Sequence, residues 1–116
     1  LTPAQIGVAK LHGTATQAND RAESNGMRRT FGEALTPMCV LKPYLGHTLG
    51  ACGLSETLLM LQALRQGPLP AVGYGEHALL PLTAEPLRVP ADSLLLANYF
   101  GFGGNNASLV LQGIAA

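Results

Sequence analysis

The segment that most constrains this fold is residues 49–66, a predicted helix that is apolar around most of its circumference. Four leucines recur at helical spacing and form one stripe: Leu54, Leu58, Leu61 and Leu64. Three further apolar residues widen that stripe: Leu59, Met60 and Ala63. The Gly67-Pro68 pair then ends the helix. Because so little of its surface is polar, this helix must be covered by protein, either inside a layered fold or against a partner.

The composition leads to the same expectation. Only 12% of the 116 residues are charged, whereas an ordinary soluble domain has about 25%, so few side chains can cover a wetted surface. The formal net charge is zero, which leaves no electrostatic footprint for nucleic acid or anionic lipid. No apolar stretch reaches the roughly 20 residues that cross a bilayer, and no basic-then-apolar secretory signal is present. We expect a soluble, cytoplasmic protein without nucleic-acid or membrane partners.

A chain of this length has room for one hydrophobic core, so we expect a single domain over residues 1–116. It begins at Leu1 rather than Met, which is typical of a cropped or processed polypeptide. Cys39 and Cys52 lack paired spacing, which favours buried free thiols over a disulfide framework or thiolate zinc site. A zinc site would need a convergence that the spacing of the histidines cannot show, so we expect no metal and no cofactor. The histidines are His12, His47 and His77.

Short apolar runs bounded by glycine, proline or turn residues predict four buried strands. These strands are expected at residues 6–11, 38–41, 94–98 and 108–112. Residues 67–90 contain many of the prolines and predict an irregular connection, with one edge strand near residues 87–89.

A second helix is expected over about residues 20–31. Asp20 and Glu23 have the spacing of a capping box, and Gly32 can close the helix. Three apolar residues would share one face of it: Ala22, Met27 and Phe31. The resulting order of strand, helix, strand, helix, strand, strand is typical of an α/β domain in which strands lie buried under helices.

Two histidine-containing motifs are candidates for a functional site. His12-Gly13-Thr14 follows a predicted strand, where α/β folds place ligand-binding groups; the alternative is a hydrogen-bonded structural histidine. Lys42 and His47 precede the apolar helix, and helix starts attract anions. There the alternative is that Lys42 is a solvated loop residue and His47 a helix cap.

A third motif is the glycine-rich segment 98–106, which contains Phe100 and Phe102. Its glycines permit positive φ and a close approach of the backbone, so the loop could gate a cavity. The alternative is a tight hairpin between two strands. The segment lacks the lysine and hydroxyl residue of a phosphate-binding loop, and no helix pattern follows it as a dinucleotide fingerprint would require.

Together and in this order, the three motifs resemble the C-terminal half of β-ketoacyl-[acyl-carrier-protein] synthases, over nearly the whole chain. Residues 12–23 match a His-Gly-Thr-x-Thr block with its following helix, which here contains Asn19, Asp20 and Glu23. Residues 42–56 match Lys-x-x-x-Gly-His-x-x-Gly-Ala-x-Gly-x-x-Glu. Residues 98–108 match Asn-x-Phe-Gly-Phe-Gly-Gly-x-Asn-Ala-Ser. The two-histidine pattern is similar to the elongating synthases, and residues 12–16 and 104–108 are similar to synthases of aryl-polyene clusters.

The resemblance implies one half of a thiolase-like fold, a mixed sheet with buried helices, and a decarboxylative Claisen condensation of an acyl thioester with malonyl-ACP. It assigns catalytic roles to His12, His47 and Lys42. The residues that it assigns to site support are Glu56, which would bridge to Lys42, Thr14 and Asn106. Phe102, with Phe100 packed beside it, would gate the acyl pocket.

The resemblance also implies partners. The family's nucleophilic cysteine belongs to an N-terminal half that these residues do not include, so we expect no condensation without that half. Acyl carrier protein and a homodimer or heterodimer of the complete synthase are further expectations. One alternative is a non-catalytic subunit similar to a chain-length factor and paired with a ketosynthase. Another is a remnant that acts only as an interaction domain.

Overall fold

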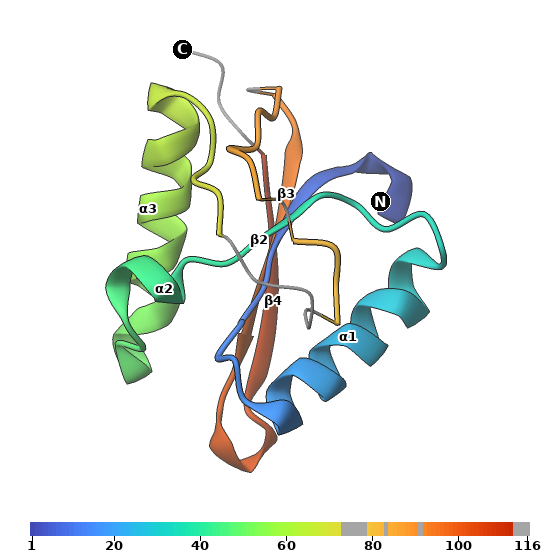
Figure 1. Cartoon of the computed structure of the whole chain (residues 1–116), viewed down its shortest axis with the longest axis vertical. Coiled ribbons are helices and arrows are strands. Elements are labelled where there is room, and N and C mark those ends of the chain that lie inside the picture. The colour runs from blue at the N-terminus through green and yellow to red at the C-terminus, as the bar shows by residue number, and fades with distance from the viewer. Residues whose placement is uncertain (73–78, 83, 91, 113–116) are drawn as a thin grey trace.

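The computed structural model describes residues 1–72, 79–82, 84–90 and 92–112 (Figure 1). Its centre is a four-stranded sheet in the order β2-β1-β3-β4. The strands are β1 (Ile6–Lys10), β2 (Met38–Cys39), β3 (Leu94–Phe100) and β4 (Asn106–Gln112). β1 runs parallel to both β2 and β3, whereas β3 and β4 are antiparallel. The sheet is therefore mixed, and the α/β prediction is confirmed.

Helices cover the two faces of this sheet. The helices are α1 (Gln17–Phe31), α2 (Lys42–Leu45) and α3 (Cys52–Gln66). α1 lies against one face, and α3 lies against the other with the short α2 beside it (Figure 1). No helix in the described part of the chain is long and apolar enough to cross a membrane. The order of elements brings the ends of β1, β2 and β3 close to the starts of α1 and α2.

The alternation of side chains along β1 produces two separate cores. Val8 belongs to the core on the α3 side, which includes Met60 of that helix. Ala9 and Leu11 belong to the core on the α1 side, which includes Met27. Since successive strand residues point to opposite faces, Lys10 lies on the same side of the sheet as Val8. This alternation carries Lys10 toward α3.

The strand predictions are close, with differences at their ends. β2 stops at Cys39, two residues early, because the Leu41 carbonyl already accepts from the Tyr44 and Leu45 N–H groups at the start of α2. β3 continues to Phe100, and β4 begins at Asn106. The predicted edge strand at residues 87–89 is reduced to one bridge, in which Leu87 exchanges two backbone hydrogen bonds with Leu69.

The predicted capping box of α1 is wrong. The helix begins at Gln17, and its N-cap is Thr16, whose hydroxyl accepts from the backbone N–H of Asn19 at 3.3 Å. Glu23 lies one turn beyond Asn19, and its buried carboxylate accepts from the backbone N–H groups of the turn that follows β1. The predicted helix face is also partly wrong, since Ala22 is exposed. The buried residues of α1 are Glu23, Ser24 and Met27.

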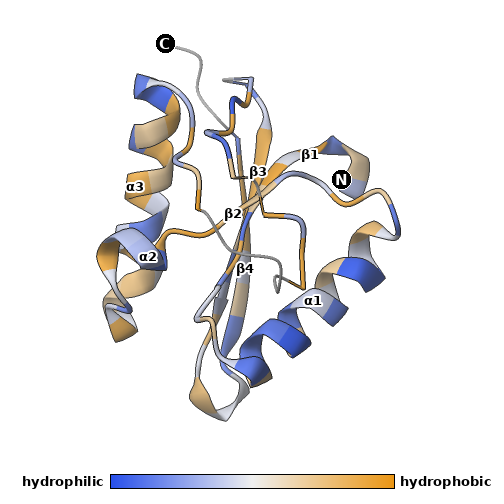
Figure 2. Ribbon diagram, viewed as in Figure 1, coloured by the Kyte–Doolittle hydropathy of each residue, from blue (hydrophilic) through white to orange (hydrophobic). Residues whose placement is uncertain are grey.

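The prediction that the last strand is buried is wrong for this chain by itself. For the leucine stripe, the two expectations were cover inside the fold or cover by a partner, and the fold leaves two of its four leucines uncovered. α3 turns Cys52, Glu56 and Met60 toward the sheet, whereas Leu54 is 69% and Leu58 56% exposed. Figure 2 shows apolar residues on α3 beyond the side that faces the sheet. β4 is also exposed along almost all of its length. One sheet covers only one side of a helix, so the rest of the apolar surface is left open.

Gly13 forms the turn that ends β1, with φ +56°. A Cβ atom built there would lie 2.4 Å from Val40 Cγ1, much closer than two non-bonded carbon atoms approach in proteins. The turn thus requires glycine both for its backbone conformation and for its packing.

We expect Gly13→Ala to lower the free energy of unfolding by roughly 2–4 kcal/mol, because left-handed backbone and overpacking both cost energy. Gly26→Ala is the matched control: Gly26 lies inside α1 with open space around it, so alanine should stabilise the helix by up to about 1 kcal/mol. Urea unfolding of both variants measures these changes. Equal stabilities would contradict the role given to the turn.

Candidate active site

The turn after β1 is held by a buried carboxylate. Glu23 accepts hydrogen bonds from the backbone N–H groups of His12 at 2.7 Å and Gly13 at 3.0 Å. The Asn98 amide of β3 donates to the same carboxylate at 3.4 Å. Sequence reasoning assigned Glu23 to a helix cap and missed this contact. It joins α1, β1 and β3 at the point where His12 leaves the sheet.

The His12 ring is buried, with 4% of the residue exposed, and its Nδ1 atom has two neighbours. The backbone N–H of Phe100 donates to Nδ1 at 3.2 Å, and Lys42 Nζ lies 3.5 Å from the same atom. Because Nδ1 accepts, the neutral ring carries its proton on Nε2. Burial and then the charges of Lys42, Lys10 and His47 lower the pKa of His12 to about 4.

His47 lies in the exposed loop that follows α2. Its Nδ1 accepts from the backbone N–H of Leu49 at 3.1 Å, the first residue of the 3₁₀ turn Leu49–Ala51 that precedes α3, although the N-cap of that turn is Thr48. A neutral His47 ring therefore also carries its proton on Nε2. The His12 and His47 ring centroids are 5.5 Å apart, with the rings nearly perpendicular. Tertiary structure thus brings together two imidazoles that lie 35 residues apart in the sequence.

Both rings line one open cleft of about 960 Å³. Lys42, Thr14 and Phe100 also line this cleft. The Thr14 hydroxyl is 3.1 Å from that of Thr16, the N-cap of α1. The cleft lies where the ends of β1 and β3 meet the segment that leads into α3, which is the edge of the sheet that the first motif predicted.

The glycine-rich loop contributes differently at each predicted position. The Phe100 ring packs beside His12, with centroids 5.4 Å apart. Phe102 lines the cleft but is fully exposed, so its ring has no packing partner among the described residues. Asn106 is exposed at the start of β4, and its neighbours Asn105 and Ala107 line the cleft in its place.

Behind His12 lies a buried ionic cluster. Lys42 Nζ is 2.7 Å from Glu56 Oε1, the contact that the resemblance implied. Lys10 forms a second ion pair with Glu56 Oε2. Sequence reasoning treated Lys10 only as part of an apolar strand. The alternation of Val8 and Lys10 toward one face was the available signal, because a charged residue at an inward position needs a buried partner.

The two cysteines are free and buried, as predicted. Burial raises the pKa of Cys39 to about 12, so this thiol is not an activated nucleophile. Cys52 lines the cleft at the start of α3, a position that the sequence did not indicate. Among the described residues, no three His, Cys, Asp or Glu side chains are grouped to hold a metal ion. His77 lies outside the described residues.

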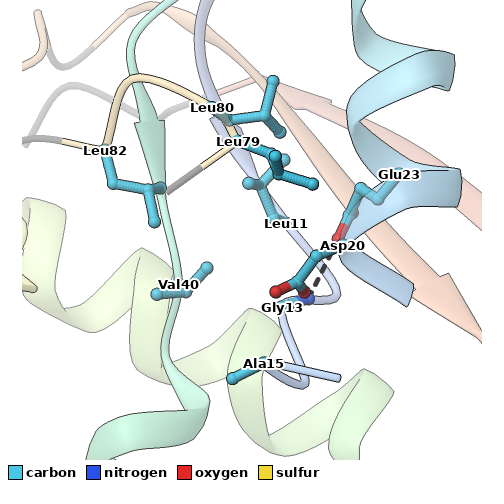
Figure 3. Close-up of a pocket in the computed structure, with 9 residues that line it drawn as sticks. All are labelled: Leu11, Gly13, Ala15, Asp20, Glu23, Val40, Leu79, Leu80 and Leu82. Atoms are coloured by element: carbon cyan, nitrogen blue, oxygen red, sulfur yellow. Dashed lines mark hydrogen bonds between the residues drawn. The ribbon is translucent and has the colours of Figure 1, made fainter. Parts of the chain in front are cut away.

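A smaller cavity of about 60 Å³ lies near the same turn, against α1 (Figure 3). Its walls are mainly leucines and Val40, and Glu23 points into it while bound to the Gly13 N–H (Figure 3). His12, His47 and Lys42 do not line it. The larger cleft is therefore the candidate active site.

Comparison with known proteins identifies the family of this chain. The family described as β-ketoacyl synthase, C-terminal domain, matches residues 1–73. The chain belongs to the β-ketoacyl synthase family. The 3-oxoacyl-[acyl-carrier-protein] synthase 2 of Vibrio cholerae is 35% identical, over 97% of this chain and 29% of the relative. The highly reducing polyketide synthase sphB of Aspergillus fumigatus is 33% identical, over 97% of this chain and 5% of the relative.

A solved structure of related sequence has the same fold. The ishigamide ketosynthase/chain length factor superposes with a TM-score of 0.82 and 30% identity, over 99% of this chain and 30% of that chain. This likeness confirms the prediction of one half of a thiolase-like fold. The ketosynthase domain described here therefore spans less than a third of the length of the bacterial synthase and of the ishigamide protein.

The low pKa of His12 predicts a pH-dependent stability. The folded protein favours the neutral ring, so between pH 6.5 and pH 4 the unfolded chain binds more protons. The stabilisation is complete above pH 6.5 and is lost as the pH falls toward 4. Between pH 7 and pH 5, the unfolding free energy should fall by roughly 2 kcal/mol less in His12→Asn than in wild type. Urea unfolding at both pH values checks this, and the same fall in both proteins would refute it.

Proposed function

We propose that this chain is the part of a β-ketoacyl-[acyl-carrier-protein] synthase that contributes two histidines to decarboxylative Claisen condensation. In this reaction a malonyl thioester loses CO₂, and the resulting enolate carbon attacks the carbonyl carbon of an acyl group bound to a cysteine. The carbon–sulfur bond to that cysteine breaks, and the thiolate leaves. The condensed product stays on the carrier protein that delivered the malonyl group.

The pair of imidazole rings carries this proposal. Loss of CO₂ places negative charge on the thioester oxygen, and preorganised N–H donors stabilise that charge without being consumed. Backbone N–H groups occupy Nδ1 of both His12 and His47, so Nε2–H is the remaining donor of each neutral ring. Both rings line the same cleft with centroids 5.5 Å apart, close enough to bind one thioester oxygen together.

Lys42 supports the neutral state of His12. Its ammonium lies 3.5 Å from His12 Nδ1 and is held there by Glu56. A protonated His12 would place a second positive charge beside this ammonium and would lose the hydrogen bond from Phe100. In the proposed mechanism Lys42 therefore keeps His12 a donor that is oriented and uncharged.

The glycine-rich loop is the proposed gate for the acyl chain. Phe102 lies at the lip of the cleft with no packing that would hold its ring. The next two residues, Gly103 and Gly104, both have positive φ, a backbone conformation in which glycine moves without side-chain strain. Movement of Phe102 toward or away from Phe100 would close or open the cleft.

The cysteine nucleophile would come from an N-terminal ketosynthase half, outside these residues. The exposed leucines of α3, Leu54 and Leu58, form the surface that this half would cover. Covering them removes apolar area from water, which stabilises association. Acyl carrier protein would deliver the malonyl group, and the complete synthase would be a homodimer or heterodimer. The aryl-polyene assignment remains a prediction within this family.

His12→Ala and His47→Ala, made in the chain assembled with its cysteine-bearing half, should each lower kcat for condensation by roughly 10²–10³-fold, because each removes one donor to the enolate oxygen. His47→Asn should lose less, since an amide retains an N–H donor. Release of CO₂ from malonyl-ACP measures the reaction. Thr30→Ala on the exposed surface of α1 is the control, and unchanged rates in both histidine variants would contradict the proposal.

A second candidate is a non-catalytic subunit similar to a chain-length factor, which would shape the pocket of a paired ketosynthase. The likeness to the ishigamide ketosynthase/chain length factor is compatible with either role, because its name includes both. The presence of both imidazoles and of Lys42 in one cleft favours the catalytic role. The two candidates differ in whether the assembled half supplies a reactive cysteine to this cleft.

Iodoacetamide labelling distinguishes these two candidates. For an active synthase, we expect alkylation of one cysteine in the N-terminal half that abolishes condensation and is slowed by a bound acyl chain. Cys39 should remain unlabelled in the folded protein, because it is buried and its pKa is raised to about 12. Intact-mass spectrometry locates the label. Absence of a reactive cysteine in the assembled half would favour the chain-length-factor candidate.

A further inference from the structure

The ionic cluster behind His12 contains more positive than negative charge. The chain has two lysines, Lys10 and Lys42, and the ammonium groups of both lie on the single carboxylate of Glu56. Lys10 and Glu56 are fully buried, and Lys42 is 7% exposed. One carboxylate cannot neutralise two ammonium groups. If Lys42 were alone with Glu56, the pair would be neutral, so Lys10 supplies the excess charge.

Two neighbours of Lys10, the Glu56 carboxylate and the Tyr99 ring, stabilise its charged form. Its ammonium lies 3.8 Å from the centroid of the Tyr99 ring, on the ring face, a position where the ring attracts a cation. The Tyr99 hydroxyl is in turn 2.6 Å from the hydroxyl of Thr57, the residue that follows Glu56 on α3. Burial acts in the opposite direction and lowers the pKa of Lys10. The carboxylate and the ring are the groups that offset this penalty.

We propose that Lys10 is a second positioning residue of the site: it holds Glu56 from the side opposite Lys42 and leaves a net positive charge behind His12 that keeps the imidazole neutral. The inference rests on the proposed role of His12 as a neutral donor. Lys10 does not line the cleft, so it acts through Glu56 and Lys42 and through its field rather than on substrate.

The charged groups around His12 come from β1, all three helices and the loop after α2, whereas β3 packs the Phe100 ring against His12 and the Tyr99 phenol against Lys10. Those groups are Lys10 on β1, Glu23 on α1, Lys42 on α2, His47 in the following loop and Glu56 on α3. Glu23 binds the backbone N–H of His12. Glu56 raises the pKa of His12, whereas Lys42, Lys10 and His47 lower it in addition to the larger effect of burial. The cations together outweigh the shared carboxylate.

Lys10→Met is the variant that tests this inference. Methionine is unbranched and apolar, and the substitution leaves Lys42 and Glu56 as a balanced pair, so the cluster stays compatible with burial. In the chain assembled with its N-terminal half, the pKa of His12 should rise from about 4 toward the ordinary value of 6.5. NMR titration of isotope-labelled histidine measures this, with His12→Asn to assign the signal.

The pH profile of condensation provides a readout that a purely structural role would not move. If protonation of His12 abolishes its function as an oriented neutral donor, the acidic limb of kcat/KM should shift to higher pH in Lys10→Met. Lys10→Gln, which is also neutral, should behave the same way. Lys10→Arg retains the charge and should keep the wild-type limb. Arg65→Met removes an exposed charge at the far end of α3 and should leave the titration of His12 unchanged.

If arginine does not fit at position 10, the two neutral variants, Lys10→Met and Lys10→Gln, still test the inference. A folded Lys10→Met or Lys10→Gln protein with an unshifted His12 titration would overturn it, and so would lower kcat with an unmoved acidic limb. The titration needs no turnover. If the assembled protein lacks condensing activity, the proposed function fails while the NMR result still decides whether Lys10 controls the charge of His12.

Discussion

The buried carboxylate of Glu56 is the contact on which the candidate site depends. It joins α3 to β1 through Lys10 and to α2 through Lys42. Removing this carboxylate would leave two buried ammonium groups without a counter-ion, a change that typically costs about 3–5 kcal/mol. Because Lys42 also lies beside His12 Nδ1, the contact that packs the helix on the sheet also sets the electrostatics of the cleft.

The two imidazoles are oriented by the backbone rather than by carboxylates. Phe100 donates to Nδ1 of His12, and Leu49 donates to Nδ1 of His47. The orientation of the His12 ring thus depends on β3, which is distant in the sequence. The orientation of the His47 ring depends on the adjacent 3₁₀ turn before α3. A second carboxylate, Glu23, holds the turn on which His12 lies. A backbone donor at Nδ1 leaves Nε2–H as the free donor of a neutral ring, which suits groups that stabilise an anion without transferring a proton.

Local patterns predicted the elements well where burial and periodicity agree. Short apolar runs bounded by turn residues identified β1 and β3, and the Gly67-Pro68 pair identified the end of α3. Prediction failed where a side chain had two possible partners. Glu23 has the spacing of a helix cap, but it accepts instead from two backbone N–H groups in the turn that follows β1. The leucine stripe was correctly identified as helical, but the sequence left open whether the fold or a partner covers it, because periodicity gives a face and not what covers it.

The sequence by itself determined the class of fold, the family, and three motifs that contain His12, His47 and Lys42, because these depend on residue type and spacing along the chain. Only the tertiary structure decided that the two rings lie 5.5 Å apart, which nitrogen of each ring is occupied, and that Lys10 shares Glu56 with Lys42. Those properties depend on how β1 and α3 are placed relative to each other and on the direction of single side chains. Pairing across 46 residues, as between Lys10 and Glu56, is set by packing in three dimensions, and no local spacing encodes it.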